Sequence, residues 1–298
     1  MQTLHAIIPL RQTIADLRKA AGPDARLALV PTMGALHDGH LALVRAARQQ
    51  AQIVAVSIFV NPRQFGANED LDAYPRTLAA DAALLEAQGV DVLWAPAVSM
   101  MYPHDYATNI SVGGVSQGLC GADRPGHFDG VATVVLKLFN QVAPDLAFFG
   151  EKDWQQLGVI RRMARDLDLA KPHVDAIYGV PIVREPDGLA LSSRNRYLSG
   201  DARVTAAALP QFMQEAVRAM AKGDACSEAL ARLRCRLLER GFDSIDYAEL
   251  RDERSLLLLD RLQEHARLFV AARIGGTRLI DNLAATVGPT QEDRRSGS

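Results

Sequence analysis

Short apolar runs alternate with segments of helical periodicity between residues 26 and 183, and this alternation constrains the fold more than any other feature of the chain. The apolar runs predict strands over residues 27–30, 53–60, 92–94, 146–149 and 173–178, and the periodic segments predict helices over 41–51, 78–88, 131–142 and 154–167. Strands joined in this way pair in parallel and are covered by helices on both faces. We therefore expect an α/β fold with a Rossmann-like doubly wound parallel sheet.

The pattern changes after residue 183. Residues 185–188 (Glu-Pro-Asp-Gly) predict a turn, helices follow over about 201–222 and 227–240, and period-two alternation predicts half-buried antiparallel strands over 245–250, 266–274 and 277–282. These elements predict a smaller C-terminal α+β domain. We expect domains over residues 1–184 and 185–287, followed by a disordered tail over 288–298, which is rich in Gly, Ser and charge.

Composition narrows the classes of partner. The 298 residues carry a formal net charge of -2, which provides no basic field for nucleic acid. No apolar run is long enough to span a bilayer, and no secretory signal is visible at the N-terminus. The three cysteines include no Cys-x-x-Cys pair, and their odd number favours a reducing compartment. We expect a cytoplasmic protein with neither nucleic acid nor a membrane as its partner.

The loop after the first predicted strand contains two histidines, in the sequence His37-Asp38-Gly39-His40. A helix begins here, and a helix N-terminus favours an anion through its unpaired N–H groups and its dipole. Histidines three residues apart can share one face and donate hydrogen bonds to a leaving pyrophosphate. A zinc protease would need i, i+4 histidines with an intervening Glu. Ordinary capping histidines are the other alternative, but Gly34 and Gly39 let the backbone approach a ligand and favour the functional interpretation.

A second motif, Gly150-Glu151-Lys152-Asp153, follows the strand predicted at 146–149 and precedes another helix. Lys152 would place a point cation beside phosphate charge. Gln156, one turn into that helix, would face the same cleft. Lysines before helices are common on protein surfaces, but a lysine that follows a central strand and a glycine is much less so.

Three further loops or helix starts carry candidate side chains. Gln64, after the second strand, can both donate and accept hydrogen bonds and suits a small substrate with hydroxyl and carboxylate groups. Asp81, in the next helix, could hold magnesium or order the histidine loop, and the sequence leaves both roles open. Ser192, Ser193 and Arg194 could close over a triphosphate, the alternative being a surface turn that caps the following helix.

The His-x-Gly-His string resembles the signature of the nucleotidyltransferase superfamily, which includes class I aminoacyl-tRNA synthetases. The loop at 192–194 resembles the mobile Lys-Met-Ser-Lys-Ser loop of that superfamily, and Arg194 takes the place of the cationic side chain of that loop. The longer string at 33–40 (Met-Gly-Ala-Leu-His-Asp-Gly-His), the motif at 150–153 and the closing segment at 278–282 (Arg-Leu-Ile-Asp-Asn) are similar to the pantothenate synthetase (pantoate–β-alanine ligase) family. Ala35 stands where some members have Asn, and Arg63 where many have Leu.

This resemblance implies ATP-dependent condensation of pantoate with β-alanine through a pantoyl-adenylate, with release of AMP and pyrophosphate. It also implies a cytoplasmic homodimer that uses magnesium, for which Asp81 is the candidate ligand. His40 would assist pyrophosphate departure as an acid, and Gln64 and Gln156 would hold pantoate, with Gln64 also touching β-alanine. The resemblance assigns catalytic roles to His40, His37, Lys152 and Arg194, and ATP binding to Met33, Gly34, Ala35, Leu36, His37, Asp38, Gly39, His40, Gly150, Glu151, Lys152, Asp153, Val180, Leu191, Ser192, Ser193 and Arg194.

Two other functions remain open at this point. A nucleotidyltransferase that moves AMP or CMP onto a phosphate would share the histidine loop but would need no amine site. A nucleotide-binding protein without activity is the second, although the presence of His37, His40, Lys152 and Arg194 counts against it. A tRNA-dependent ligase is disfavoured by the net charge and by the small second domain.

Overall fold

The computed structural model describes residues 1–66 and 71–285. The chain divides into two compact units, Met1–Val183 and Arg184–Ser298. The tail expected over 288–298 lies outside the described residues, as do residues 67–70 in the loop after the second long strand.

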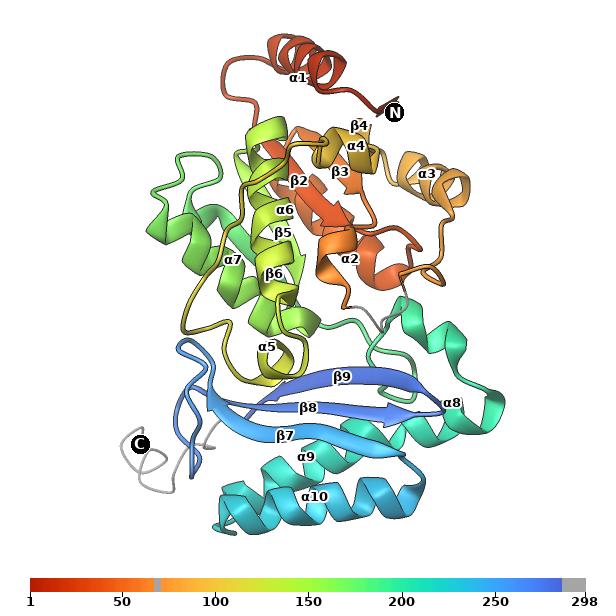
Figure 1. Ribbon diagram of the computed structural model, residues 1–298, viewed down its shortest axis with the longest axis vertical. Coiled ribbons are helices and arrows are strands. Elements are labelled where there is room, and N and C mark those ends of the chain that lie inside the picture. Colours follow the sequence, from red (N-terminus) through yellow and green to blue (C-terminus); the bar gives the residue numbers. More distant parts are fainter. Residues whose placement is uncertain (67–70, 286–298) are drawn as a thin grey trace, which may run out of the picture. The chain divides into compact units, whose positions relative to one another are not determined.

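The first unit is built on a six-stranded sheet in which every pairing is parallel, in the order β1-β4-β3-β2-β5-β6 (Figure 1). This confirms the expected α/β architecture. The strand order reverses beside β2, because the chain first builds outward through β3 and β4 and later places β5 and β6 on the other side. The strands are β1 (Gln2–Leu4), β2 (Leu27–Thr32), β3 (Ile53–Ile58), β4 (Val92–Trp94), β5 (Leu146–Gly150) and β6 (Ile177–Val180).

Helices cover both faces of this sheet, which is why its central strands are continuous apolar runs. On one face pack α2 (Asp38–Gln50) and α3 (Leu78–Ala87), and on the other α1 (Ile7–Ala21), α6 (His127–Val142) and α7 (Trp154–Asp166). Leu43, Val44 and Ala47 of α2 lie at helical spacing and are buried against Val54 and Val56 of β3. Shorter helical segments are Pro62–Gln64, α4 (Val98–Met101), α5 (Leu119–Asp123), Glu151–Asp153 and Val174–Ala176.

The N-terminal elements β1 and α1 are not predicted by the sequence pattern. Strand β1 has only three residues, and its partner β4 lies far along the chain. Helix α1 contains Pro9 in its first turn, where a missing N–H is tolerated because those N–H groups have no intrahelical partner. The strand expected at 173–178 was placed too early, since Val174–Ala176 forms a 3₁₀ turn and the strand is Ile177–Val180.

The second unit is α+β, as expected. It contains an antiparallel sheet in the order β7-β8-β9, formed by β7 (Ser244–Asp252), β8 (Ala266–Ile274) and β9 (Thr277–Ala284). The helix expected over 201–222 is interrupted at Ala207 and forms α8 (Gly200–Ala206) and α9 (Ala208–Ala221), and α10 (Cys226–Arg240) packs beside α9. The central strand β8 is buried along its length from Ala266 to Ala272, rather than half-buried.

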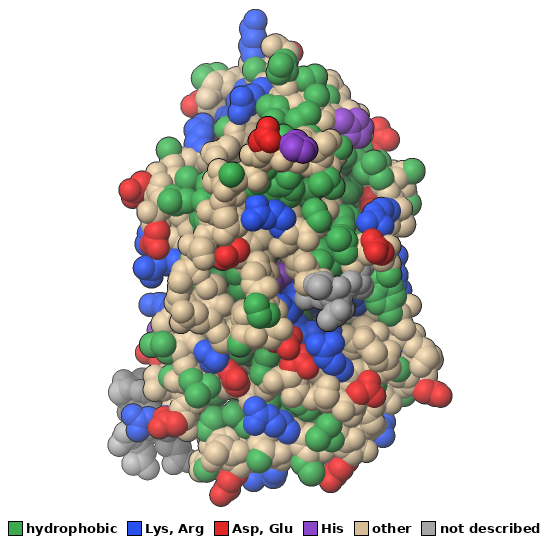
Figure 2. Space-filling model, viewed as in Figure 1, with side chains coloured by type: hydrophobic (Ala, Val, Ile, Leu, Met, Phe, Trp, Pro, Cys, Tyr) green, Lys and Arg blue, Asp and Glu red, His purple; other side chains and the backbone are tan. Residues whose placement is uncertain are grey.

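The surface carries both signs of charge. On the face seen in Figure 2, Lys and Arg side chains are interspersed with Asp and Glu, in keeping with the small net charge. No helix in the described ranges is both long and apolar enough to cross a membrane. All three cysteines lie within these ranges and none forms a disulfide, with Cys120 and Cys226 buried and Cys235 exposed.

Candidate active site

The loop that leaves β2 lies at the point where the strand order reverses, which is where open α/β sheets bind their ligands. Thr32 ties this loop to the neighbouring strand, because its Oγ1 donates to the Ser57 carbonyl at 2.8 Å and accepts from Gly34 N at 3.2 Å. Gly34 has φ 85°, and a Cβ at this position would lie 3.1 Å from Ile58 Cγ2 and 3.2 Å from Asp81 Oδ2. Both the backbone conformation and the space therefore require glycine here.

Asp81 holds the next two residues of the loop from α3. Its carboxylate is buried and accepts from Ala35 N and from Leu36 N, each at 2.9 Å, and Thr77 Oγ1 donates to it at 3.0 Å. Ala35 has φ 51°, a left-handed conformation that is costly for a residue with a Cβ, and these hydrogen bonds keep it there. Of the two roles left open for Asp81, the structure favours the ordering of the histidine loop.

His37 and His40 cap the first turn of α2 reciprocally. The Nδ1 of His37 accepts from Gly39 N at 3.1 Å, and the Nδ1 of His40 accepts from His37 N at 3.3 Å. The two ring centroids are 4.1 Å apart. Because a backbone N–H can only donate, each Nδ1 must carry a lone pair, and the proton of each neutral imidazole is on Nε2. The pair therefore offers two Nε2–H donors at a helix start.

His40 is uncharged at neutral pH. Burial is the largest of the effects that lower its pKa to about 3; the nearby His37 and Lys152 act in the same direction, and Asp153 opposes them. The acid expected at this position is therefore a neutral Nε2–H donor rather than an imidazolium. Such a donor stabilises developing negative charge without a full proton transfer.

The second motif lies at the same edge of the sheet. Gly150 ends β5 and is in register with Val180, the last residue of β6. A 3₁₀ turn, Glu151–Asp153, follows Gly150 and leads into α7. Since the charges of Lys152 and Asp153 both act on the pKa of His40, this turn is close to the histidine pair. The first unit thus brings together the predicted residues at 33–40, 150–153 and 180.

Gln64 is oriented by Asn61, to which the sequence pattern assigns no role in the site. The Asn61 side chain is buried, its Nδ2 donates to Gly130 O at 3.1 Å, and its Oδ1 accepts from Arg63 N at 3.3 Å. These two backbone partners fix which end of the amide is which. Asn61 Nδ2 also donates to Gln64 Oε1 at 2.8 Å, so Gln64 is left with its Nε2 donors for a ligand.

Three other side chains hold the Gln64 turn. Tyr102 donates its hydroxyl to Asn61 Oδ1 at 2.8 Å, and burial raises the pKa of Tyr102 to about 12, so the hydroxyl keeps its proton. The Gln64 carbonyl accepts from Arg124 Nη2 at 3.0 Å and lies 2.8 Å from His127 Nδ1. An Asn-Pro pair after a strand signals a loop, but no local pattern could have identified Tyr102 or Arg124.

Gln156 is half-buried in the first turn of α7, and the neighbouring Gln155 has a different task. Gln155 is buried, accepts from Cys120 N at 3.1 Å, and donates from Nε2 to the carbonyls of Val115 and Gly118, each at 3.1 Å. It therefore secures the loop before α5, leaving Gln156 as the glutamine that α7 can offer to a ligand.

The remaining predicted residues, Leu191, Ser192, Ser193 and Arg194, belong to the second unit. Ser192 caps the 3₁₀ helix Ser193–Tyr197, since its Oγ accepts from Arg194 N at 3.2 Å. The following helix, α8, is capped instead by Ser199, whose Oγ accepts from Ala202 N at 3.3 Å. The Ser192 cap fixes the backbone that carries the hydroxyls and the guanidinium.

The donor set does not fit a magnesium site built by protein carboxylates. Both Asp81 oxygens already accept backbone N–H groups. In residues 1–66 and 71–285, no group of three or more His, Cys, Asp or Glu side chains could hold a metal ion.

A parallel sheet with paired imidazole donors at its switch point and a lysine at the next strand end is typical of an α/β nucleotide-binding enzyme. A family profile described as pantoate-beta-alanine ligase matches residues 2–284. The chain belongs to the pantothenate synthetase (pantoate–β-alanine ligase) family, as the sequence motifs predict.

Relatives and solved structures agree with this membership. A pantothenate synthetase of Novosphingobium aromaticivorans is 62% identical over 290 residues, which cover 97% of this chain and 100% of that protein. A pantothenate synthetase of Rhizorhabdus wittichii is 59% identical over 97% of this chain and 100% of its own length. The crystal structure of pantothenate synthetase from Thermus thermophilus matches with a TM-score of 0.86 and 46% identity, over 96% of this chain and 100% of that one. A pantoate-beta-alanine ligase from Francisella tularensis, complexed with beta-gamma ATP and beta-alanine, matches with a TM-score of 0.80 and 33% identity, over 97% and 100%.

Proposed function

We propose that this protein condenses pantoate with β-alanine at the expense of ATP, through a pantoyl-adenylate, and releases AMP and pyrophosphate. The observation that carries the proposal is the His37–His40 pair, whose Nδ1 atoms both accept backbone N–H groups and whose Nε2–H groups are therefore donors beside Lys152. The beta-gamma ATP and beta-alanine bound by the Francisella tularensis ligase support the nucleotide and the amine as substrates.

Adenylation must precede amide formation, because a carboxylate is a poor electrophile toward an amine. A carboxylate oxygen of pantoate attacks the α-phosphorus of ATP, the bond from that phosphorus to the bridging oxygen breaks, and pyrophosphate leaves. Negative charge increases on the phosphate oxygens, where the Nε2–H groups of His37 and His40 and the ammonium of Lys152 stabilise it. The loop at 33–40, the turn at 150–153 and Val180 form the nucleotide site of the first unit.

In the second step the amine of β-alanine attacks the carbonyl carbon of the adenylate, and the bond from that carbon to the phosphate oxygen breaks. AMP leaves, and the amine nitrogen loses a proton to water. Gln64 presents Nε2 donors, which suit the acceptor oxygens of pantoate and of β-alanine, and Gln156 binds pantoate from α7. Because an acyl-adenylate hydrolyses in water, the site must close during the reaction. The loops over 61–77 and 186–197 are the lids in this proposal, and residues 67–70 of the first lie outside the described residues.

Leu191, Ser192, Ser193 and Arg194 contribute to ATP binding from the second unit, with the Arg194 guanidinium suited to a phosphate by its fork of donors. Because Asp81 does not fit as a magnesium ligand, no step above depends on a metal ion held by the protein. Magnesium would enter mainly on the phosphates of the nucleotide, as it does in many ATP sites.

A cytoplasmic homodimer is part of the same proposal, and it is supported by the family resemblance alone. Light scattering coupled to size-exclusion chromatography would measure the mass in solution against the 32.4 kDa of one chain. A monomer at micromolar concentration would contradict the dimer without affecting the proposed chemistry.

Pantoate-dependent exchange of labelled pyrophosphate into ATP, without β-alanine, tests the first step. We expect exchange, and we expect β-alanine to then yield pantothenate and AMP. A folded protein that binds ATP but shows neither exchange nor pantothenate would contradict the proposal. Nucleotide transfer onto a phosphate acceptor without β-alanine would instead favour a nucleotidyltransferase.

A further inference from the structure

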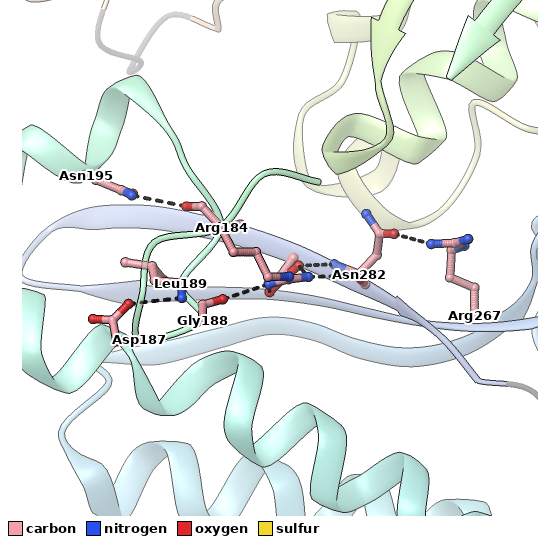
Figure 3. Close-up of polar contacts among 9 residues, drawn as sticks. Arg184, Asp187, Gly188, Leu189, Asn195, Arg267 and Asn282 are labelled. Atoms are coloured by element: carbon pink, nitrogen blue, oxygen red, sulfur yellow. Dashed lines mark hydrogen bonds and ion pairs between the residues drawn. The ribbon is translucent and has the colours of Figure 1, made fainter. Parts of the chain in front are cut away.

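Asn195 closes the segment that carries Ser192, Ser193 and Arg194. Its Nδ2 donates to the Ala190 carbonyl at 3.1 Å, which joins the two ends of residues 191–194 (Figure 3). Within this closed loop, Asn195 N donates to Ser192 O at 3.0 Å and Arg194 N to Ser192 Oγ at 3.2 Å. The backbone at 192–194 is therefore held from both ends and from within.

The base of this loop is anchored in the sheet of the second unit. Arg184 and Ala190 form an isolated antiparallel bridge. Ala190, whose carbonyl accepts the hydrogen bond from Asn195, is therefore itself held in place. The Arg184 guanidinium pairs in a bidentate way with Asp281 of β9, at 2.7 and 2.9 Å, and it also donates to Gly188 O at 3.0 Å (Figure 3). The Asp281 side chain is only 1% exposed. Asn195 thus ties residues 192–194 to a rigid support.

Asn195 is not explained by the stability of the fold alone. Its Oδ1 is buried and has no hydrogen-bond partner in the described part of the chain. A buried acceptor without a partner lowers the stability of the folded protein. The Nδ2 contact of Asn195 is therefore kept although the burial of Oδ1 is unfavourable. A residue that served only packing would have no need of that arrangement.

We propose that Asn195 is a positioning residue for ATP binding, because its Nδ2 contact with Ala190 holds Ser192, Ser193 and Arg194 in the arrangement that meets the triphosphate. This inference rests on the proposed function, which assigns those three residues to ATP. A preorganised loop loses less conformational entropy when the ligand binds. Release of the loop should therefore weaken ATP binding and leave pantoate binding, which is assigned to Gln64 and Gln156, unchanged.

The test compares Asn195→Ala with the wild type. We expect the KM for ATP in pyrophosphate exchange to rise roughly tenfold or more, with the KM for pantoate within about twofold. Trypsin cleavage after Arg194 and Arg196 should accelerate at a temperature well below the melting temperature, because the loop is no longer closed. Asn140→Ala, which changes an exposed residue at the end of α6, is the matched control and should alter none of these quantities.

A second variant distinguishes loss of the Ala190 contact from a general loss of structure. Asn195→Asp keeps the size of the side chain but places a carboxylate oxygen against the Ala190 carbonyl, and it should reproduce the rise in the KM for ATP and the faster cleavage. The inference is overturned if both variants leave the KM for ATP and the cleavage rate unchanged. It is also overturned if they raise the KM for ATP and for pantoate in parallel with a fall in melting temperature, since that pattern indicates a general loss of structure.

Arg194→Ala separates this inference from the proposed function. If that variant leaves the KM for ATP unchanged, the assignment of the loop to ATP binding is wrong. The role of Asn195 in ATP binding is then contradicted as well. If Arg194→Ala raises the KM for ATP and the Asn195 variants do not, the loop binds ATP but Asn195 does not position it.

Discussion

Gly130, in the first turn of α6, lies so close to Arg63 that a Cβ at position 130 would stand 2.1 Å from the Arg63 carbonyl oxygen. The Gly130 carbonyl in turn accepts from Asn61 Nδ2 at 3.1 Å. The turn that presents Gln64 is therefore set by a close approach of two backbones that only glycine permits.

Gly130→Ala should displace this turn. The new methyl group would force Arg63 and Gln64 away from α6 and break the Asn61 contact, so we expect the KM for pantoate to rise roughly tenfold or more and the melting temperature to fall. Gly113→Ala is the matched control, because a Cβ there meets nothing within 4 Å and its φ is not in the left-handed region. A normal KM for pantoate in Gly130→Ala would show that the position of the turn does not matter for this substrate.

Asp81→Asn should disorder the histidine loop. An amide can face only one of the two backbone N–H groups with its oxygen, so a buried donor is left without an acceptor, at a cost of about 1–3 kcal/mol. We expect a higher KM for ATP and a lower stability in denaturant unfolding. Raising the magnesium concentration should not restore the KM, and a full restoration would instead support Asp81 as a magnesium ligand.

Substitutions of His40 distinguish a neutral donor from an imidazolium. His40→Gln can place an amide N–H near the position of Nε2, whereas His40→Ala removes the donor. We expect the rate of single-turnover adenylation to fall roughly a hundredfold or more in His40→Ala and in Lys152→Ala. The rate should fall clearly less in His40→Gln than in His40→Ala. Equal losses in the two His40 variants would contradict the role of a neutral donor.

The half-buried His40 should also make the free energy of unfolding depend on pH. Its pKa is about 3 in the folded protein and 6.5 ordinarily, so below pH 6.5 the unfolded chain takes up a proton that the folded protein does not. The contribution of His40 to the free energy of unfolding is fully present above about pH 6.5 and decreases as the pH drops toward 3. At pH 5.5 the decrease is roughly 1–1.5 kcal/mol. Between pH 7.5 and pH 5.5 the free energy of unfolding, measured with denaturant, should fall less in His40→Gln than in the wild type. An identical fall in the two proteins would contradict a desolvated neutral imidazole at this position.

Asp281→Asn should destabilise the second unit strongly. Asp281 is paired bidentately with Arg184, and removal of one charge of a buried pair leaves the other without compensation, which costs about 3 kcal/mol or more. Asp166→Asn is the control, since the Arg162–Asp166 pair is about half exposed on both sides and should contribute at most about 0.5 kcal/mol. A similar small effect for both variants in thermal unfolding would contradict the structural importance of the Arg184–Asp281 pair.

Much of the fold follows from local pattern. The strand Val92–Trp94 and the strand Ala266–Ile274 have the predicted bounds, because a short apolar run or an alternation between turns is a local property. Helix α2 begins at Asp38, three residues before the predicted start, because the cap made by His37 and His40 depends on side-chain geometry. Strand β1 was missed because its pairing partner, β4, lies about 90 residues away in the chain.

By itself the sequence determined the α/β class, the family and the motifs at 33–40, 150–153 and 192–194, since these depend on residues that are neighbours in the chain. Only the tertiary structure decided that Asp81 binds backbone N–H groups 46 and 45 residues away, and that Asn61 is oriented by a carbonyl 69 residues away and so turns the Nε2 of Gln64 to a ligand. It also decided that His40 is neutral, because its pKa depends on burial and on charges contributed by another strand end. Proton positions and donor directions are set by what surrounds a side chain, and no local pattern of residues contains that information.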